Sequence, residues 1–279
     1  MIYLLFAILS SAMISICMRI SENHIKDETG MFLVNYGICA ILSFVFMEQS
    51  DNILGLQNQM VTVLTGMAGG ALYLGGFLML RFNIKHNGIV LSATFMKLGV
   101  LIPTVMAVII FGEFPTGMQL IGIVMALAAI VIIHFEKDSL NQGDKKIWLL
   151  VLLTMGGLAD SMANFFDKLG DPSGKDGYLL ITFCTATLLT LLLAIKRKKK
   201  ITKLDIIFGI LVGIPNYYFS VFLLAALREV SSVIVYPTYS IGAMVIIVIA
   251  GIVAFKEKIS IKKGVALCLI AVAIALLNL

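Results

Sequence analysis

Lys97 is the residue of this sequence whose charge and position most clearly suggest a chemical role. It stands in LSATFMKLGVLIP, near the middle of an apolar run from residue 88 to 111 that is long enough to cross a bilayer as a helix. An ammonium group at the centre of a membrane helix costs at least about 2.5–3.5 kcal/mol, so its presence needs a cause. We expect Lys97 to bind a carboxylate or phosphate group of a ligand, or to exchange a proton. The alternative is a structural ion pair.

Asp160 places a second charge inside another apolar run, in GLADSMANFF at residues 157–166. An ionisable group in such a segment usually faces a partner or a water-filled cavity. Two interpretations stay open. Asp160 pairs with Lys97 when the site is empty, or it binds an ammonium group or a proton. If both charges face one cavity, a zwitterion such as an amino acid satisfies each of them.

Prolines and polar side chains within apolar runs mark the remaining candidate positions. A proline inside a helix removes one backbone hydrogen bond and kinks the helix, and the freed carbonyl is tolerated only within protein or against water. We therefore predict hinges at Pro103, Pro215 and Pro237. The other side chains expected to contact a ligand are Tyr73, Thr94, Asn164, Asn216, Tyr217, Ser220, Tyr236 and Tyr239. Each of the last two tyrosines is alternatively an anchor at the membrane interface.

Composition restricts the class of protein. Hydrophobic residues make up 60% of the 279 residues and charged residues 13%, and the mean hydropathy is +1.02. A soluble domain has about 25% charged residues, so this chain has too little polar surface for a water-soluble globule. We predict an all-α integral membrane protein of the cell (inner or plasma) membrane. The net charge of +5 sits in short loops, so we expect no nucleic acid as a partner.

We expect neither a metal site nor a set of catalytic groups. The four cysteines and three histidines are not spaced as zinc ligands or as a CxxC motif. The glycines of GMAGGALYLGG, residues 66–76, follow no strand and so do not form a nucleotide loop. They are expected to permit close helix packing. The sequence therefore predicts no cofactor and no enzyme.

Ten apolar segments have the length of a membrane span. They are residues 1–18, 30–47, 60–80, 88–111, 117–135, 147–166, 177–195, 205–227, 230–255 and 261–277. IYLLFAILSS at residues 2–11 aligns with IWLLVLLTMG at 147–156, and FGE at 111–113 aligns with FKE at 255–257. We predict two five-helix repeats, residues 1–135 and 147–279, joined by a polar cytoplasmic linker at 136–146. Because five is odd, the repeats have inverted topology, which is typical of alternating-access transporters.

Basic residues in the loops predict the orientation. The loops after the first, third, fifth, seventh and ninth segments carry most of the 21 Lys and Arg residues, including KRKKK at residues 196–200. Basic loops favour the cytoplasm, so both chain termini are expected outside it. We interpret KRKKK as an anchor at the lipid headgroups.

The stretch VIIFGEFPTGMQLIGIVMALAAIVII, residues 108–133, resembles the drug/metabolite transporter superfamily, in particular its ten-helix EamA-like branch. An apolar helix, Gly-Glu, a short turn and a glycine-containing helix carry the resemblance. The second copy, IVAFKEKISIKKGVALCLIAVAIALL at 252–277, matches it with Lys256 in place of the glycine. The resemblance covers the whole chain. It implies a central cavity lined by the first, third, fourth, sixth, eighth and ninth helices.

Together, the resemblance and the charges imply a secondary transporter. We expect it to export a small polar metabolite, an amino acid or a related compound, by alternating access around the central cavity. The expected partners are this small-molecule substrate, the lipid bilayer and protons, and the chain is expected as a monomer or a homodimer. Alternatives are a transporter of the same fold for drugs or organic cations, or for nucleobases or sugar phosphates. Further alternatives are a channel and a membrane enzyme.

Overall fold

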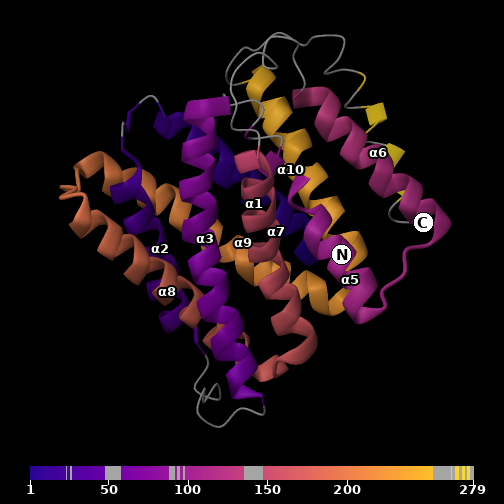
Figure 1. Cartoon of the computed structure of the whole chain (residues 1–279), viewed down its shortest axis with the longest axis horizontal. Helices are drawn as coiled ribbons and strands as arrows, with labels where there is room; N and C mark the ends of the chain where they lie inside the picture. The colour runs from indigo at the N-terminus through magenta and orange to yellow at the C-terminus, as the bar shows by residue number, and fades with distance from the viewer. Residues whose placement is uncertain are drawn as a thin grey trace. The chain divides into compact units, whose positions relative to one another are not determined.

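The computed structural model describes residues 1–22, 24–25, 27–47, 58–87, 92, 95–96, 98–134 and 147–253, with residues 265, 268–269, 272–273 and 275–276 near the end of the chain. Every secondary-structure element in these ranges is helical (Figure 1). The elements are α1 Ile2–Glu22, α2 Thr29–Val45, α3 Gln59–Asn87, α5 Leu101–Phe111, α6 Gly117–His134, α7 Ile147–Leu169, the 3-10 turn η3 Pro172–Gly174, α8 Lys175–Lys196, α9 Lys203–Glu229 and α10 Ser232–Val253.

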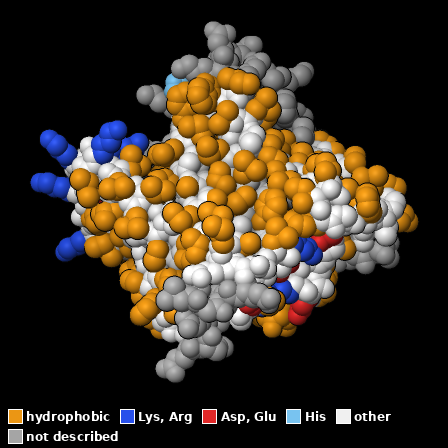
Figure 2. Space-filling view, turned by 60° about the horizontal axis from the view of Figure 1, so that its bottom comes forward, with side chains coloured by type: hydrophobic (Ala, Val, Ile, Leu, Met, Phe, Trp, Pro, Cys, Tyr) orange, Lys and Arg blue, Asp and Glu red, His pale blue; other side chains and the backbone are white. Residues whose placement is uncertain are grey.

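Several of these helices have the length and composition of membrane spans. Among the described residues, five helical stretches are long and apolar enough to cross a membrane: Ile2–Ser21, Gln59–Leu80, Ile147–Leu169, Pro172–Lys196 and Lys203–Glu229. Figure 2 shows hydrophobic side chains over most of the described surface in view, with Lys and Arg side chains gathered in small areas. The predicted all-α class is thus confirmed for the described residues, and their helices are compatible with a membrane protein.

The ends of several helices differ from the predicted segments. The first predicted segment ended at residue 18 and the third at residue 80, whereas α1 continues to Glu22 and α3 to Asn87. Hydropathy marks where the apolar stretch stops, but a helix continues until a breaker or cap ends it. The sequence RFNIKHN after Leu80 holds no glycine or proline before Gly88, and its polar side chains are tolerated on a helix.

The predicted continuous helix at 88–111 is wrong, because the chain forms a turn at Gly99 and Val100 and α5 begins only at Leu101. The physical cause is Pro103, which has no N–H to donate to the carbonyl of Gly99. Proline is tolerated in the first turn of a helix, where no intrahelical partner is needed, and Pro103 lies there. The backbone N–H of Ile102 instead donates to the Gly99 carbonyl at 3.0 Å.

The chain divides into two compact units. Unit 1 comprises Met1–Leu74 and Met162–Glu229, and unit 2 comprises Gly75–Ser161 and Val230–Leu279. The divisions fall inside α3 and α7. Each unit therefore takes segments from both predicted five-helix halves. The two units are defined by contacts in space. The repeats at 1–135 and 147–279 and the linker between them are defined by similarity within the sequence, and they stay a prediction.

Small residues bring the helices of unit 1 close together. In this unit α9 packs against α1 and α2, and α2 packs against α8 (Figure 1). A Cβ added at Gly213 in α9 would lie 3.0 Å from the backbone oxygen of Asn35 in α2. A Cβ added at Gly66 in α3 would lie 2.9 Å from a methyl of Ile181 in α8. The predicted role of the 66–76 glycines in close packing is confirmed at this position.

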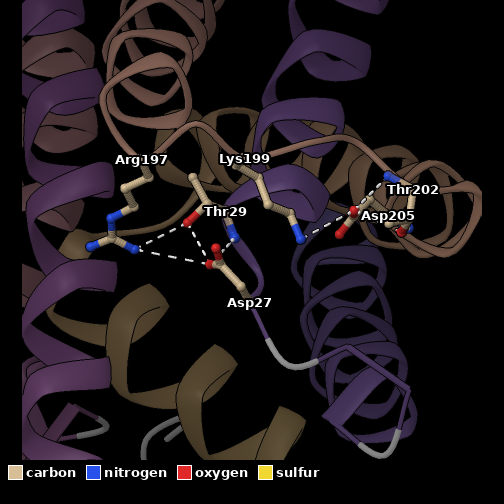
Figure 3. A network of polar contacts seen from close by, with 6 residues as sticks. All are labelled: Asp27, Thr29, Arg197, Lys199, Thr202 and Asp205. Atoms are coloured by element: carbon tan, nitrogen blue, oxygen red, sulfur yellow. Dashed lines mark hydrogen bonds and ion pairs between the residues drawn. The ribbon is translucent and has the colours of Figure 1, made fainter.

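A polar network fixes the loop between α8 and α9 in unit 1 (Figure 3). Arg197 donates to the Thr29 hydroxyl at 3.2 Å and lies 4.0 Å from Asp27, at the start of α2. The ammonium group of Lys199 lies 3.4 Å from Asp205, which is fully buried in the first turn of α9. Two residues of KRKKK thus hold helix N-termini in place, a role that goes beyond the predicted headgroup anchor.

In unit 2, α10 packs against α5 and α6. The buried side chains of Ala107, Ile123, Val233, Ile241 and Met244 belong to one apolar cluster between these elements. At the end of α5, Gly112 adopts φ 67°, a left-handed conformation that glycine accepts without steric cost. The loop that follows carries Glu113, which accepts a hydrogen bond of 2.6 Å from Ser231, just before α10. This contact ties the ends of α5 and α10 together.

Candidate functional site

Asp160 in α7 is held by two tyrosines of α10, all within unit 2. The Tyr239 hydroxyl donates to the Asp160 carboxylate oxygen Oδ2 at 2.6 Å. The Tyr236 hydroxyl donates to the backbone oxygen of Asp160 at 2.8 Å. Residues three apart lie on the same face of a helix, so both rings reach the same turn of α7. Three of the residues predicted to contact a ligand therefore form one cluster.

The Asp160 contact has the geometry of a strong hydrogen bond. A hydroxyl donating to a carboxylate typically lies at about 2.5–2.7 Å and is about twice as strong as a bond between neutral groups. The ring of Tyr236 is fully buried and that of Tyr239 nearly so, while Asp160 is partly exposed. The Tyr239 hydroxyl therefore orients the carboxylate of a residue that is partly exposed. Such a group can bind an ammonium group or carry a proton.

Thr238, between these tyrosines, is a candidate that the sequence analysis did not single out. Its hydroxyl is buried and has no hydrogen-bond partner in the part of the chain that the structure describes. Most other threonines in these helices donate to the carbonyl four residues earlier, as Thr104 does to Val100 at 2.9 Å. Nothing in the sequence distinguishes Thr238 from them. Its hydroxyl is available for a ligand or a water molecule.

A small cavity adjoins this segment of α10. It has a volume of about 10 Å³ and is lined by Thr104 of α5 and by Pro237 and Ile241 of α10, among other residues. This is about the space that one water molecule needs. Thr104 lies in α5 and Pro237 lies in α10. Each of these two helices of unit 2 contains a predicted hinge, Pro103 in α5 and Pro237 in α10. A rearrangement of either helix would change the size of this space.

The chain on both sides of Lys97 lies against α7, one helical turn before Asp160. A Cβ added at Gly157 would collide with the backbone oxygen of Gly99, and one added at Gly156 would lie 3.9 Å from that of Met96. Lys97 itself and Thr94, the other predicted residue of this segment, lie outside the described residues. The glycines thus bring the backbone of this segment close to the Asp160 helix, whereas the predicted pair of Lys97 and Asp160 stays a prediction.

The remaining predicted residues lie in unit 1. Asn216 donates to the side-chain oxygen of Asn35 at 3.2 Å, and Ser220 donates to the backbone oxygen of Asn216 at 3.2 Å. The ring of Tyr217 stacks on Phe46 at a centroid distance of 6.1 Å, and that of Tyr73 stacks on Phe183 at 6.5 Å. Asn164 is buried in the unit 1 part of α7.

Asn35 is the residue of unit 1 whose role the sequence analysis did not identify. It is buried and accepts the Asn216 hydrogen bond, and the nearby Cys39 thiol donates to the backbone oxygen of Gly213 at 3.2 Å. Pro215, a predicted hinge, lies between these contacts in α9. The sequence feature that marks Asn35 is that an asparagine is rare in an apolar segment. This rarity does not identify the residue to which Asn35 is hydrogen-bonded.

Comparisons with known proteins support the fold. No family model matches the chain. A protein of Haemophilus influenzae described as uncharacterized is 25% identical over 272 residues, covering 92% of this chain and 90% of that protein. A solved crystal structure, described only as that of a protein, aligns with a TM-score of 0.75 at 15% identity, covering 99% of this chain and 94% of the other. This similarity shows a shared fold and carries no information on activity.

Proposed function

We propose that this chain is a secondary transporter that moves a small polar metabolite, an amino acid or a related compound, across the cell membrane by alternating access. The observation that carries the proposal is the partly exposed Asp160 carboxylate within an apolar helix, oriented by the Tyr239 hydroxyl at 2.6 Å. Ionisable residues inside apolar segments usually face a water-filled cavity or the interior of the helix bundle, and many of them belong to a substrate or proton pathway. A carboxylate in a partly exposed residue can bind a cationic partner or a proton reversibly.

The topology is part of the same proposal. Ten spans in two inverted five-helix repeats, with both termini outside the cytoplasm, follow from the apolar segments and the basic loops. The resemblance to the drug/metabolite transporter superfamily supports the two five-helix repeats, whereas the orientation rests on the basic loops alone. Support comes from the described helices, which fall on the predicted apolar segments, and from the five that are long and apolar enough to span a membrane.

The substrate class follows from the chemistry of the cluster. Asp160 binds the ammonium group of the substrate or a coupling proton. Lys97 binds the carboxylate of the substrate. This assignment explains why one apolar segment of the sequence carries an acidic residue and another a basic one, since a zwitterion neutralises both when it binds.

Movement of the site is proposed to occur at the proline positions. Pro237 lies inside α10 between the two tyrosines, and Pro103 follows the turn at Gly99 and Val100. Each leaves a backbone carbonyl without its usual partner, which lowers the cost of bending there. Bending of α10 would move Tyr236 and Tyr239 relative to Asp160 and would change which side the carboxylate faces.

A transporter of organic cations is the second candidate. The rings of Tyr236 and Tyr239 lie 6.0 Å apart at 63°, beside a carboxylate. Aromatic rings around an acid are the chemistry that attracts substituted ammonium groups. In this case Asp160 alone supplies the charge, and the substrate needs no carboxylate.

The test is a thermal-unfolding screen of purified protein with amino acids, nucleobases, sugar phosphates and quaternary amines. A ligand at about 100 times its dissociation constant adds about 2.7 kcal/mol to the stability of the folded state. We expect amino acids to stabilise the wild type and Asp176→Asn, a control in the first turn of α8, but not Asp160→Asn. Stabilisation by quaternary amines alone would favour the second candidate, and equal responses of all three proteins would contradict a role for Asp160.

A further inference from the structure

Unit 1 carries an apolar groove between α1 and α9. Its volume is about 420 Å³, and its lining is almost entirely apolar. The lining residues are Leu9, Ser10, Met13, Ile210, Leu211, Ile214, Pro215, Tyr218 and Phe222. Most of the large side chains among them are exposed, for example 52% for Met13 and 45% for Leu211. An apolar groove that opens outward needs an apolar occupant or an apolar solvent.

A charged pocket adjoins one end of this groove. It has a volume of about 320 Å³ and is lined by Tyr3 of α1, by Lys175 at the start of α8 and by Arg228 and Glu229 at the end of α9. Phe222 lines both the groove and the pocket. Its ring packs on Phe6 at 5.2 Å and on Tyr218 at 5.9 Å. The two cavities therefore meet at one aromatic side chain.

The charges of the pocket fit a single anionic group. Arg228 donates to the backbone oxygen of Pro172 and lies 3.9 Å from Asp167, and Glu229 accepts from the chain's terminal amine at 3.0 Å. Lys175 has no ion-pair partner among the residues that the structure describes. Its ammonium group and the unused donors of the Arg228 guanidinium thus leave positive charge at the head of the groove.

The length of the groove fits one leaflet of a bilayer. Ile210 and Phe222 are the first and last residues of α9 that line the groove. An α-helix rises about 1.5 Å per residue, so they lie about 18 Å apart along α9, slightly more than half of a hydrocarbon core of about 30 Å. The charged pocket comes beyond Phe222, at the end of the same helix. A molecule that fills both cavities has an anionic head and an apolar chain of this length.

We propose that the α1–α9 groove and its charged pocket form a binding site for one bilayer phospholipid. The acyl chain lies along the groove, and the phosphodiester binds Lys175 and Arg228. The shared phosphodiester makes both anionic and zwitterionic phospholipids ligands, with the anionic ones preferred because the pocket carries net positive charge. The residues of this site belong to unit 1, whereas those of the Asp160 cluster belong to unit 2.

The experiment measures the thermal unfolding of delipidated protein in detergent as phosphatidylglycerol is added. Diacylglycerol has the chains without the phosphate, and glycerol phosphate has the phosphate without the chains. We expect only the phospholipid to raise the unfolding temperature. Stabilisation of the same size by either fragment would overturn the proposal, because one of the two cavities would then be dispensable.

Two variants test the two cavities separately. Lys175→Gln is expected to weaken the apparent affinity for phosphatidylglycerol by about tenfold, while the matched control Lys168→Gln, an exposed lysine outside the pocket, leaves it unchanged. Ile214→Trp places a large ring in the groove and is expected to weaken binding, whereas Leu192→Trp on the exposed surface of α8 does not. Wild-type affinity in Lys175→Gln, or in Ile214→Trp, would contradict the site.

Discussion

At the scale of single residues, the proposed function depends on the contact between Tyr239 and Asp160. The sequence indicated both residues because each is polar in an apolar segment, but it could not indicate that they meet. They are 79 positions apart, and their contact depends on how α7 and α10 pack. The same limit applies to Asn216 and Asn35, which are 181 positions apart. A polar residue that is rare in an apolar segment can be predicted to be important from the sequence. Its hydrogen-bond partner cannot, because that partner depends on how the helices pack.

Tyr239→Phe removes the hydroxyl donor and keeps the ring. A hydrogen bond to a charged group contributes about 1.5–3 kcal/mol, and partial exposure of Asp160 reduces this to about 1 kcal/mol. We expect Tyr239→Phe to lower the unfolding temperature and to weaken substrate binding, as measured by thermal unfolding with and without the stabilising amino acid. Tyr218→Phe, whose ring is 38% exposed on α9, is the control and should match the wild type. Loss of stability in the control, or none in Tyr239→Phe, would argue against the contact.

At the scale of elements, apolar length predicted the described helices well and their ends poorly. The end of α3 at Asn87 and the turn at Gly99 and Val100 depend on breakers and on the missing N–H of Pro103, which hydropathy does not register. The 3-10 turn η3 was not predicted either. It is fixed by Asp171, whose carboxylate accepts from the backbone N–H of Ser173 at 2.9 Å.

The start of α9 shows how a polar network fixes an element. The Thr202 backbone N–H donates to the Asp205 carboxylate at 2.8 Å, and the Asp205 backbone N–H donates to the Thr202 hydroxyl at 3.2 Å. This reciprocal pair is a capping box, and Lys199 adds an ion pair to the same carboxylate oxygen at 3.4 Å. A Cβ added at Gly30 of α2 would lie 2.8 Å from the carboxylate carbon of Asp205. The network therefore couples the starts of α2 and α9.

Asp205→Asn keeps the size of the side chain and removes its charge. Breaking a buried ion pair by removing the charge of one partner destabilises a protein by roughly 3–5 kcal/mol, because the other charge stays without its partner. We expect a clear drop in the unfolding temperature in detergent. Asp176→Asn, at the first turn of α8, should cost only about 0.3–1 kcal/mol through the helix dipole. Equal unfolding temperatures for the two variants would show that the Lys199 contact adds no stability.

At the scale of the whole molecule, each compact unit combines segments from both halves of the chain. Unit 1 joins the beginning of the chain to Met162–Glu229, and unit 2 joins the middle to the last residues. The sequence predicted which segments are apolar but not this grouping, because hydropathy carries no information on which helices become neighbours. Lys97 and the last predicted segment contribute to the functional proposal through the sequence alone.

Saturable exchange across a membrane is the property that defines a secondary transporter. A channel passes its solute in proportion to the gradient, and an enzyme forms a product without net flux. An alternating-access protein instead exchanges a labelled outside substrate for an unlabelled inside one, because the loaded site returns across the membrane. This behaviour requires a coordinated conformational change of the whole chain.

The most direct test is counterflow in proteoliposomes loaded with the amino acid that stabilises the protein most. The account predicts transient, saturable accumulation of labelled amino acid by the wild type, and a rate at least about tenfold lower in Asp160→Asn, from the loss of a charged hydrogen bond to the substrate. Two results would contradict the claim that this protein is a secondary transporter. One is a flux that rises linearly with the concentration of the amino acid, and the other is equal accumulation in liposomes that contain no protein.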